Sequence, residues 1–163
     1  RACSRGDPMK QRPQYVIAVA RDDDIPALAP HLRAADVEEI RAASGLSPAD
    51  ALRQSFDLST HVWVARDRLG QPIALWGVGP LSLVLGKGCP WLLASAAFDD
   101  YGRDIGRLSR RLLASVQAIY PALENRVDAR HTKAIRWLAW LGFTIEQPEP
   151  WGVEARPFHR FWM

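Results

Sequence analysis

The segment DARHTKAIRWLAWLGF, residues 128–143, limits the possible folds of this chain more than any other stretch. Its apolar residues recur every three or four positions, which predicts an amphipathic helix. Gly142 is suited to a left-handed helix end, and Phe143 follows it into the core. Short strand-like segments lie on both sides, so the helix is expected to connect two strands. Two interpretations of this helix stay open: a helix that binds a cofactor, and an ordinary amphipathic helix without a ligand.

The rest of the chain predicts a sheet with helices around it. Residues 61–81 predict an antiparallel hairpin that turns near Gly70. Leu28, Leu32, Val37 and Ile40 are expected to face inward from a helical region at 21–45, in which Asp36 is read as a start signal. The other expected elements are strands at 15–20, 91–95, 125–129, 142–146 and 158–163, helices at 47–56 and 103–120, and a loop at 86–90. Antiparallel strands followed by alternating strands and helices predict an α/β fold with a mixed central sheet.

Length and composition favour one folded domain. The chain has 163 residues, of which 48% are apolar, and no apolar run approaches the roughly 20 residues of a membrane span. We expect residues 15–163 to form a single domain and residues 1–14 an N-terminal tail. Met9 is a candidate natural start, which would make residues 1–8 a remnant of cloning or of a longer precursor. The tail lacks the apolar stretch of a secretory signal, and two cysteines make no disulfide framework, so a reducing cytoplasm is expected.

Charge and histidine spacing disfavour two classes of function. The four histidines are scattered without metal-ligand spacing, so no metal site is expected. The net charge of +3 suits a phosphate-bearing cofactor as well as a nucleic acid. Only the tail FHRFW, residues 158–162, alternates aromatic with basic residues, so nucleic-acid binding is not favoured.

The order of elements and the segment 128–143 resemble the GNAT family of acetyl-CoA-dependent N-acetyltransferases. In that family the helix reads Asn-x-x-Ala-Ile and closes with Leu-Gly-Phe before the next strand. His131 stands where the family favours Asn, and Leu138 where it often has a Tyr that protonates the CoA thiolate, which leucine cannot do. The matching positions are Ala134, Ile135, Leu141, Gly142 and Phe143. The resemblance implies a GNAT-like acyl-CoA N-acyltransferase fold.

A second motif of the family is the pyrophosphate loop, Arg/Gln-x-x-Gly-x-Gly/Ala at the start of the long helix. Here Arg103-Asp-Ile-Gly106-Arg-Leu108 matches the first two fixed positions and departs at the third. The resemblance implies acetyl-CoA as cofactor, with Arg103, Gly106 and Arg107 on the pyrophosphate and His131 and Ala134 beside the pantetheine arm. A solvated helix face is the alternative for these arginines.

The resemblance also implies where the chemistry would occur. An amine would attack the thioester between the strands WLLAS and VDA, while backbone N–H groups stabilise the oxyanion. The candidate catalytic residues are His131, Ser95 and Tyr101. His131 could assist proton transfer or simply hydrogen-bond locally at the helix entry, Ser95 follows the central strand, and Tyr101 is a phenol away from the family's Tyr position.

A narrower resemblance concerns a GNAT-like group encoded by tailed bacteriophages, often described as internal virion or assembly proteins. It rests on LRAADVEEIRAASG, PIALWGV, PWLLAS and AIRWLAWLGF. It implies a location in the host cell cytoplasm or the virion. Two functions therefore stay open: an N-acetyltransferase acting on an amine-bearing small molecule or protein, and a non-catalytic GNAT fold that binds a virion or host protein. Whether the chain is an enzyme is not decided by its sequence.

Overall fold

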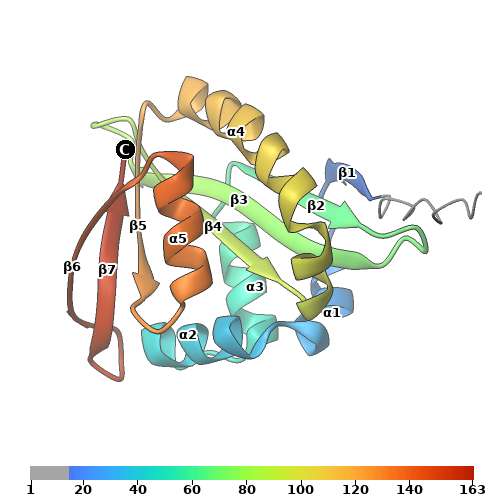
Figure 1. The fold of residues 1–163 in the computed structure, drawn as a ribbon, viewed down its shortest axis with the longest axis horizontal. Coiled ribbons are helices and arrows are strands. Elements are labelled where there is room, and N and C mark those ends of the chain that lie inside the picture. The colour runs from blue at the N-terminus through green and yellow to red at the C-terminus, as the bar shows by residue number, and fades with distance from the viewer. Residues whose placement is uncertain (1–14) are drawn as a thin grey trace, which may run out of the picture.

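The computed structural model describes residues 15–163, apart from the side chains at 102–108 and 111. One strand and a run of helices come first, three consecutive strands follow, and strands and helices alternate only between residues 87 and 151 (Figure 1). In order they are β1 (Val16–Val19), α1 (Asp24–Leu28), the 3₁₀ turn η1 (Ala29–His31), α2 (Ala34–Ser44), α3 (Pro48–Asp57), β2 (His61–Arg66), β3 (Pro72–Ser82), β4 (Lys87–Ala94), the 3₁₀ turn η2 (Ala96–Tyr101), α4 (Gly102–Ile119), β5 (Ala122–Asp128), α5 (Thr132–Leu141), β6 (Thr144–Trp151) and β7 (Arg156–Trp162).

The strands form one seven-stranded sheet in the order β1-β2-β3-β4-β5-β7-β6. All neighbours are antiparallel except β4 and β5, which run parallel and pair only at Lys87 with Ala122 and Gly88 with Leu123. Beyond Gly88 the two strands diverge toward their carboxyl ends, and α2 crosses below the open end (Figure 1). The expected α/β fold with a mixed sheet flanked by helices is confirmed.

The two larger of three apolar clusters lie on opposite faces of the sheet. On one face, Leu52 of α3 packs with Val62, Val64 and Leu75 of β2 and β3. On the other, α4 and α5 pack through the buried Val116 and Leu138 against side chains of β3, β5 and β7. Because each face has its own helices, the gap between β4 and β5 lies between two helical layers.

Local signals explain several element ends. The Ser47 hydroxyl accepts a hydrogen bond from the Asp50 N–H at 3.1 Å, with Pro48 at the first turn of α3. Gly142 ends α5 with φ 103°, a left-handed conformation that glycine adopts without strain. Among the described helices, none is both long and apolar enough to cross a bilayer.

Three expectations for the elements are wrong. Residues 87–90 belong to β4 rather than to a loop, because they pair with β3 from Val78 to Ser82. Asp36 does not start a helix: α2 begins two residues earlier, and the carboxylate is buried. Val37 is 36% exposed, so it lies outside the inward face of α2.

Candidate functional site

The gap between β4 and β5 opens into a cavity of about 600 Å³ with walls from both faces of the sheet. On one side lie residues of α2 and α3, including Glu39, Ile40 and Ala51. On the other lie residues of α4 and α5, including Leu112, Ala134 and Leu138. A cavity of this volume is within the range of small-molecule and cofactor sites.

The hydrogen-bond alternation of β4 shows which main-chain groups face the gap. The Pro90 carbonyl accepts a bond from Asn125 Nδ2 at 2.9 Å, across the gap from β5. Both main-chain groups of Ala94 point away from β3. Its N–H donates to Asp36 Oδ2 at 2.9 Å, and its C=O accepts from the Arg33 N–H at 2.9 Å. Because strand residues alternate in direction, Leu92, midway between them, also directs its N–H into the gap. A main-chain donor is thus present on the β4 edge.

A buried polar cluster closes the open end of the gap beside β4. Asp36 is 3% exposed and accepts bonds from Arg33 Nε and Nη2 at 3.0 and 2.9 Å. His131 Nε2 lies 3.0 Å from Asp36 Oδ1. Burial alone would raise the pKa of Asp36, but the hydrogen bonds from His131 and Arg33 outweigh it and hold the pKa below its usual value. Asp36 therefore anchors α2, β4 and the start of α5 to one another.

Glu39 lies beside this cluster, on the β5 edge of the gap. Its Oε2 accepts a hydrogen bond from the Asp128 N–H at 3.1 Å, and its half-buried side chain lines the cavity. Burial raises the pKa of Glu39 to about 7, and the negative charges of Asp36 and Asp128 add to this effect, while the Asp128 N–H and His131 oppose it. A carboxyl group with such a pKa can take up and release a proton near neutral pH.

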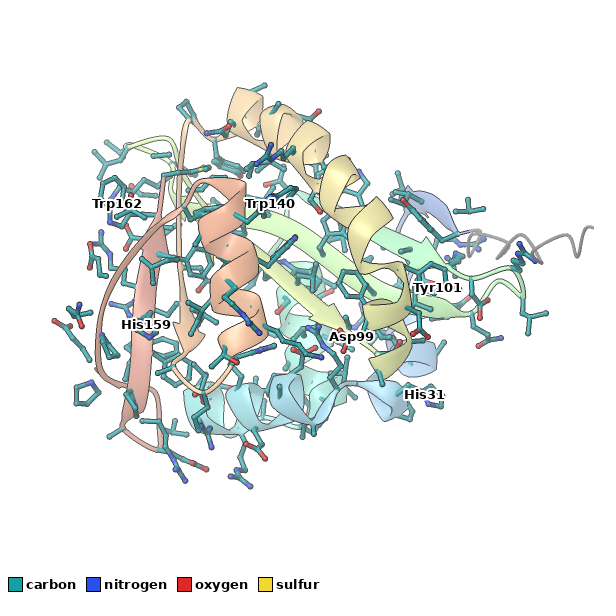
Figure 2. All side chains as sticks on the ribbon, in the orientation of Figure 1. His31, Asp99, Tyr101, Trp140, His159 and Trp162 are labelled. Atoms are coloured by element: carbon teal, nitrogen blue, oxygen red, sulfur yellow. The ribbon has the colours of Figure 1, made fainter. Side chains whose placement is uncertain are left out.

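Asp99 lies beside the start of α4 and the end of β4 (Figure 2), where two basic side chains contact it. Lys133 Nζ lies 2.7 Å from Asp99 Oδ2, and Arg33 Nη1 lies 3.8 Å from Asp99 Oδ1. All three residues line the cavity. The acidic charge that Asp99 places near the helix start is therefore compensated.

The structure brings His131 and Ala134 to the cavity and places two other candidates outside its lining. The Ser95 hydroxyl donates to the Ile73 carbonyl at 3.1 Å, which directs it toward β3. The Tyr101 ring packs edge-to-face on Tyr15, at 5.7 Å between centroids. Arg103, Gly106 and Arg107 lie in the first turns of α4, where the side chains are outside the described part of the chain.

Sequence reasoning missed Glu39. Asp36, Glu39, Ile40 and Ala43 follow the spacing of one helical face, and all four line the cavity. Two acidic residues on an otherwise apolar face were the available signal, because charged groups on a buried face are costly unless they serve a purpose.

No metal site is evident in residues 15–163 as described: no group of three or more His, Cys, Asp and Glu side chains is arranged to hold an ion. Asp36 and Glu39, the acids near the gap, instead bind Arg, His and main-chain N–H groups.

No protein-family model matches the sequence, and no curated protein matches it. Solved structures do resemble the fold. A GCN5-related N-acetyltransferase from Kribbella flavida is 19% identical with a TM-score of 0.66, over 91% of this chain and 96% of that one. Spermidine N-acetyltransferase from Vibrio cholerae, in complex with CoA and spermine, is 14% identical with a TM-score of 0.64, over 92% and 95%. The chain therefore has the fold of the GNAT N-acetyltransferases.

Proposed function

We propose that the protein is an N-acetyltransferase that transfers an acetyl group from acetyl-CoA to a primary amine in the gap between β4 and β5. The observation that carries this proposal is Glu39, a carboxyl group of raised pKa at the edge of a cavity that penetrates the sheet. The CoA and spermine in the Vibrio cholerae structure support a CoA donor and an amine acceptor.

The residues at the gap fit an acyl-CoA. The open strands leave room for an extended chain, and the wall formed by Leu112, Ala134 and Leu138 suits its apolar parts. The Leu92 N–H would donate to the thioester carbonyl, where negative charge develops. Arg103 and Arg107, in the first turns of α4, would hold the pyrophosphate at a helix N-terminus.

Glu39 would act as the general base. An alkylamine is protonated at neutral pH and cannot attack until it loses a proton. Glu39 takes that proton; the nitrogen lone pair then forms the C–N bond, and the C–S bond breaks. The second amine proton neutralises the departing thiolate, and Glu39 returns its own proton to water. This sequence balances without a tyrosine, in agreement with Leu138 at the family's Tyr position.

The first test is binding of acetyl-CoA by calorimetry or thermal shift. A ligand that binds only the folded state stabilises it by RT ln(1 + [L]/Kd), about 2.7 kcal/mol at 100 times Kd. The wild type should gain this stabilisation, and Arg103→Ala/Arg107→Ala should lose most of it. Glu39→Gln should keep it but release CoA thiol about 100-fold more slowly, or slower still, in the presence of amines. Absence of any shift at millimolar acetyl-CoA would overturn the proposal.

The second candidate is a phage-encoded GNAT fold that binds a virion or host protein without catalysis. Two observations favour it: Leu138 in place of a proton donor, and the exposed apolar turn between β3 and β4, where Leu83, Val84 and Leu85 are 79%, 96% and 67% exposed. It predicts no acetyl-CoA binding in the same calorimetric experiment. The host cytoplasm or virion location belongs to this proposal and rests on the sequence resemblance.

A further inference from the structure

The cavity on the Glu39 side of the gap is predominantly apolar and aromatic. Because the amine must reach Glu39 to lose its proton, this is the side on which the acceptor would lie. Side chains of α2, α3, β4, β5, β6 and β7 contribute to its wall. The principal ones are Ile40, Ala43, Trp91, Leu93, Trp151 and Phe158.

The aromatic rings are fixed by contacts within the protein. Trp91 Nε1 donates to Ser59 Oγ at 2.8 Å. A Cβ at Gly77 would lie 3.0 Å from Trp91 Nε1, so glycine makes room for the indole. Trp151 packs edge-to-face on Phe158, with 5.1 Å between ring centroids. Rings that are already ordered can receive an apolar group without a further loss of side-chain entropy.

The carboxylates on this wall can bind one ammonium group of an acceptor but not a second one. Of the carboxylates lining the cavity in the described chain, Asp36 and Asp99 are bound to basic side chains, and only Glu39 has no basic partner within bonding distance. A second carboxylate able to receive a second ammonium group is therefore lacking among the described lining residues.

Arg126 adds a positive charge to the same wall. It lies on β5, two residues before Asp128, and lines the cavity. Its guanidinium carbon lies 5.2 Å from the centroid of the Trp151 ring, and within the described chain it has no carboxylate in ion-pair contact. An acceptor that extends from Glu39 toward the aromatic rings would meet this positive charge.

We infer that the acceptor is a primary monoamine on an apolar, aromatic body, and that Arg126 repels acceptors with a second positive charge. This inference rests on the proposed function, since it names the substrate class of the same site. The amine would lie at Glu39 and the ring among Trp91, Trp151 and Phe158.

The test compares 2-phenylethylamine with spermidine and methylamine as acceptors for the wild-type protein. We expect kcat/KM for 2-phenylethylamine to exceed that for each of the others by about tenfold or more, the equivalent of one partly buried ring. A preference for spermidine, or equal rates for the three amines, would overturn the inference while leaving the acetyltransferase proposal intact.

A charge reversal tests the role of Arg126. Arg126→Glu should raise the ratio of the spermidine rate to the 2-phenylethylamine rate by about tenfold. Arg110→Glu is the matched control, because it changes the net charge by the same amount at an exposed position of α4. The Arg110 guanidinium carbon lies 4.1 Å from the centroid of the Trp140 ring. An unchanged ratio in Arg126→Glu, with both variants folded by circular dichroism, would contradict the inference.

Binding without turnover separates the two proposals. If no amine is acetylated but millimolar 2-phenylethylamine raises Tm where spermidine does not, and Trp151→Ala removes the effect, the monoamine site stands and the acetyltransferase proposal fails. If neither amine raises Tm and no amine is acetylated, both are overturned.

Discussion

Glu39 Oε2 accepts a hydrogen bond from the main-chain N–H of Asp128, and this bond joins the middle of α2 to the end of β5 across 89 positions of sequence. It places a carboxyl group with a pKa of about 7 at the open end of the gap between β4 and β5. Helix α2, which closes the gap, thus also supplies Glu39. Among the described residues that line the cavity, Glu39 is the only carboxylate without a basic partner.

Replacing Glu39 by Gln should lower kcat/KM for amine acetylation by about 100-fold or more, because a general base contributes roughly 10²–10⁴-fold. Glu38→Gln is the control, since Glu38 is the exposed neighbour that pairs with Arg130 at 3.2 Å. Steady-state thiol release measures both. Equal rates for the two variants would rule out Glu39 as the base.

The raised pKa of Glu39 also predicts how stability changes with pH. Between about pH 4.5, the ordinary value, and pH 7, the unfolded chain loses this proton while the folded protein keeps it. The free energy of unfolding therefore falls as pH rises through this window, by at most about 1.4 kcal/mol per pH unit from this group. Glu39→Gln should be more stable than the wild type above pH 7 and lose this part of the slope. Urea unfolding from pH 4.5 to 8 is the measurement; an identical slope in the variant would contradict the assignment.

Replacing His131 by Ala should destabilise the protein by about 1–3 kcal/mol, the cost of removing a partner from the buried Asp36 carboxylate. The pKa of Asp36 should rise, so the stability that depends on its ionised form should be lost at a higher pH as the solution is acidified. Urea unfolding at pH 7 and pH 4 measures both effects. His31→Ala, at an exposed position in η1, should change stability by less than about 0.5 kcal/mol.

A buried ion pair far from the gap predicts a purely structural effect. Asp24 is 1% exposed and pairs with Arg66, and it also accepts a bond from the Arg21 N–H at 2.7 Å. Asp24→Ala should cost about 3–5 kcal/mol because it leaves Arg66 without its partner. Asp23→Ala, at the exposed neighbouring position, should stay within about 0.5 kcal/mol. Thermal unfolding distinguishes them, and similar midpoints would contradict the role given to Asp24.

Local signals in the sequence predicted much of the fold. Gly142 and Phe143 ended α5 as expected, and Ser47 capped α3, because caps depend on neighbouring residues. The start of β4 was not predicted, since Gly88 and Pro90 resemble a turn and only their pairing with β3 makes them a strand. Cross-strand pairing joins distant residues and leaves little trace in a short window.

The candidate site was predicted less well than the fold. His131 lines the cavity, and the catalytic and cofactor-binding roles given to it stay predictions, while its partner Asp36 was read as a helix start. Glu39 was missed because its role depends on where Asp128 lies in the folded protein. Ser95 and Tyr101 had suitable chemistry and a suitable place in the chain order, yet their side chains turn toward β3 and Tyr15 instead.

Pro90, whose carbonyl receives the Asn125 amide, has a consequence for how the gap is maintained. In a parallel ladder that continued past Gly88, the residue at position 90 would donate its N–H to β5, and proline has none. The proline ring thus removes the one main-chain donor that β4 could offer to β5 at this position, which favours the divergence of the two strands. A ligand that enters between β4 and β5 therefore has no main-chain-to-main-chain hydrogen bond to break at this position, where the side-chain amide of Asn125 makes the contact instead.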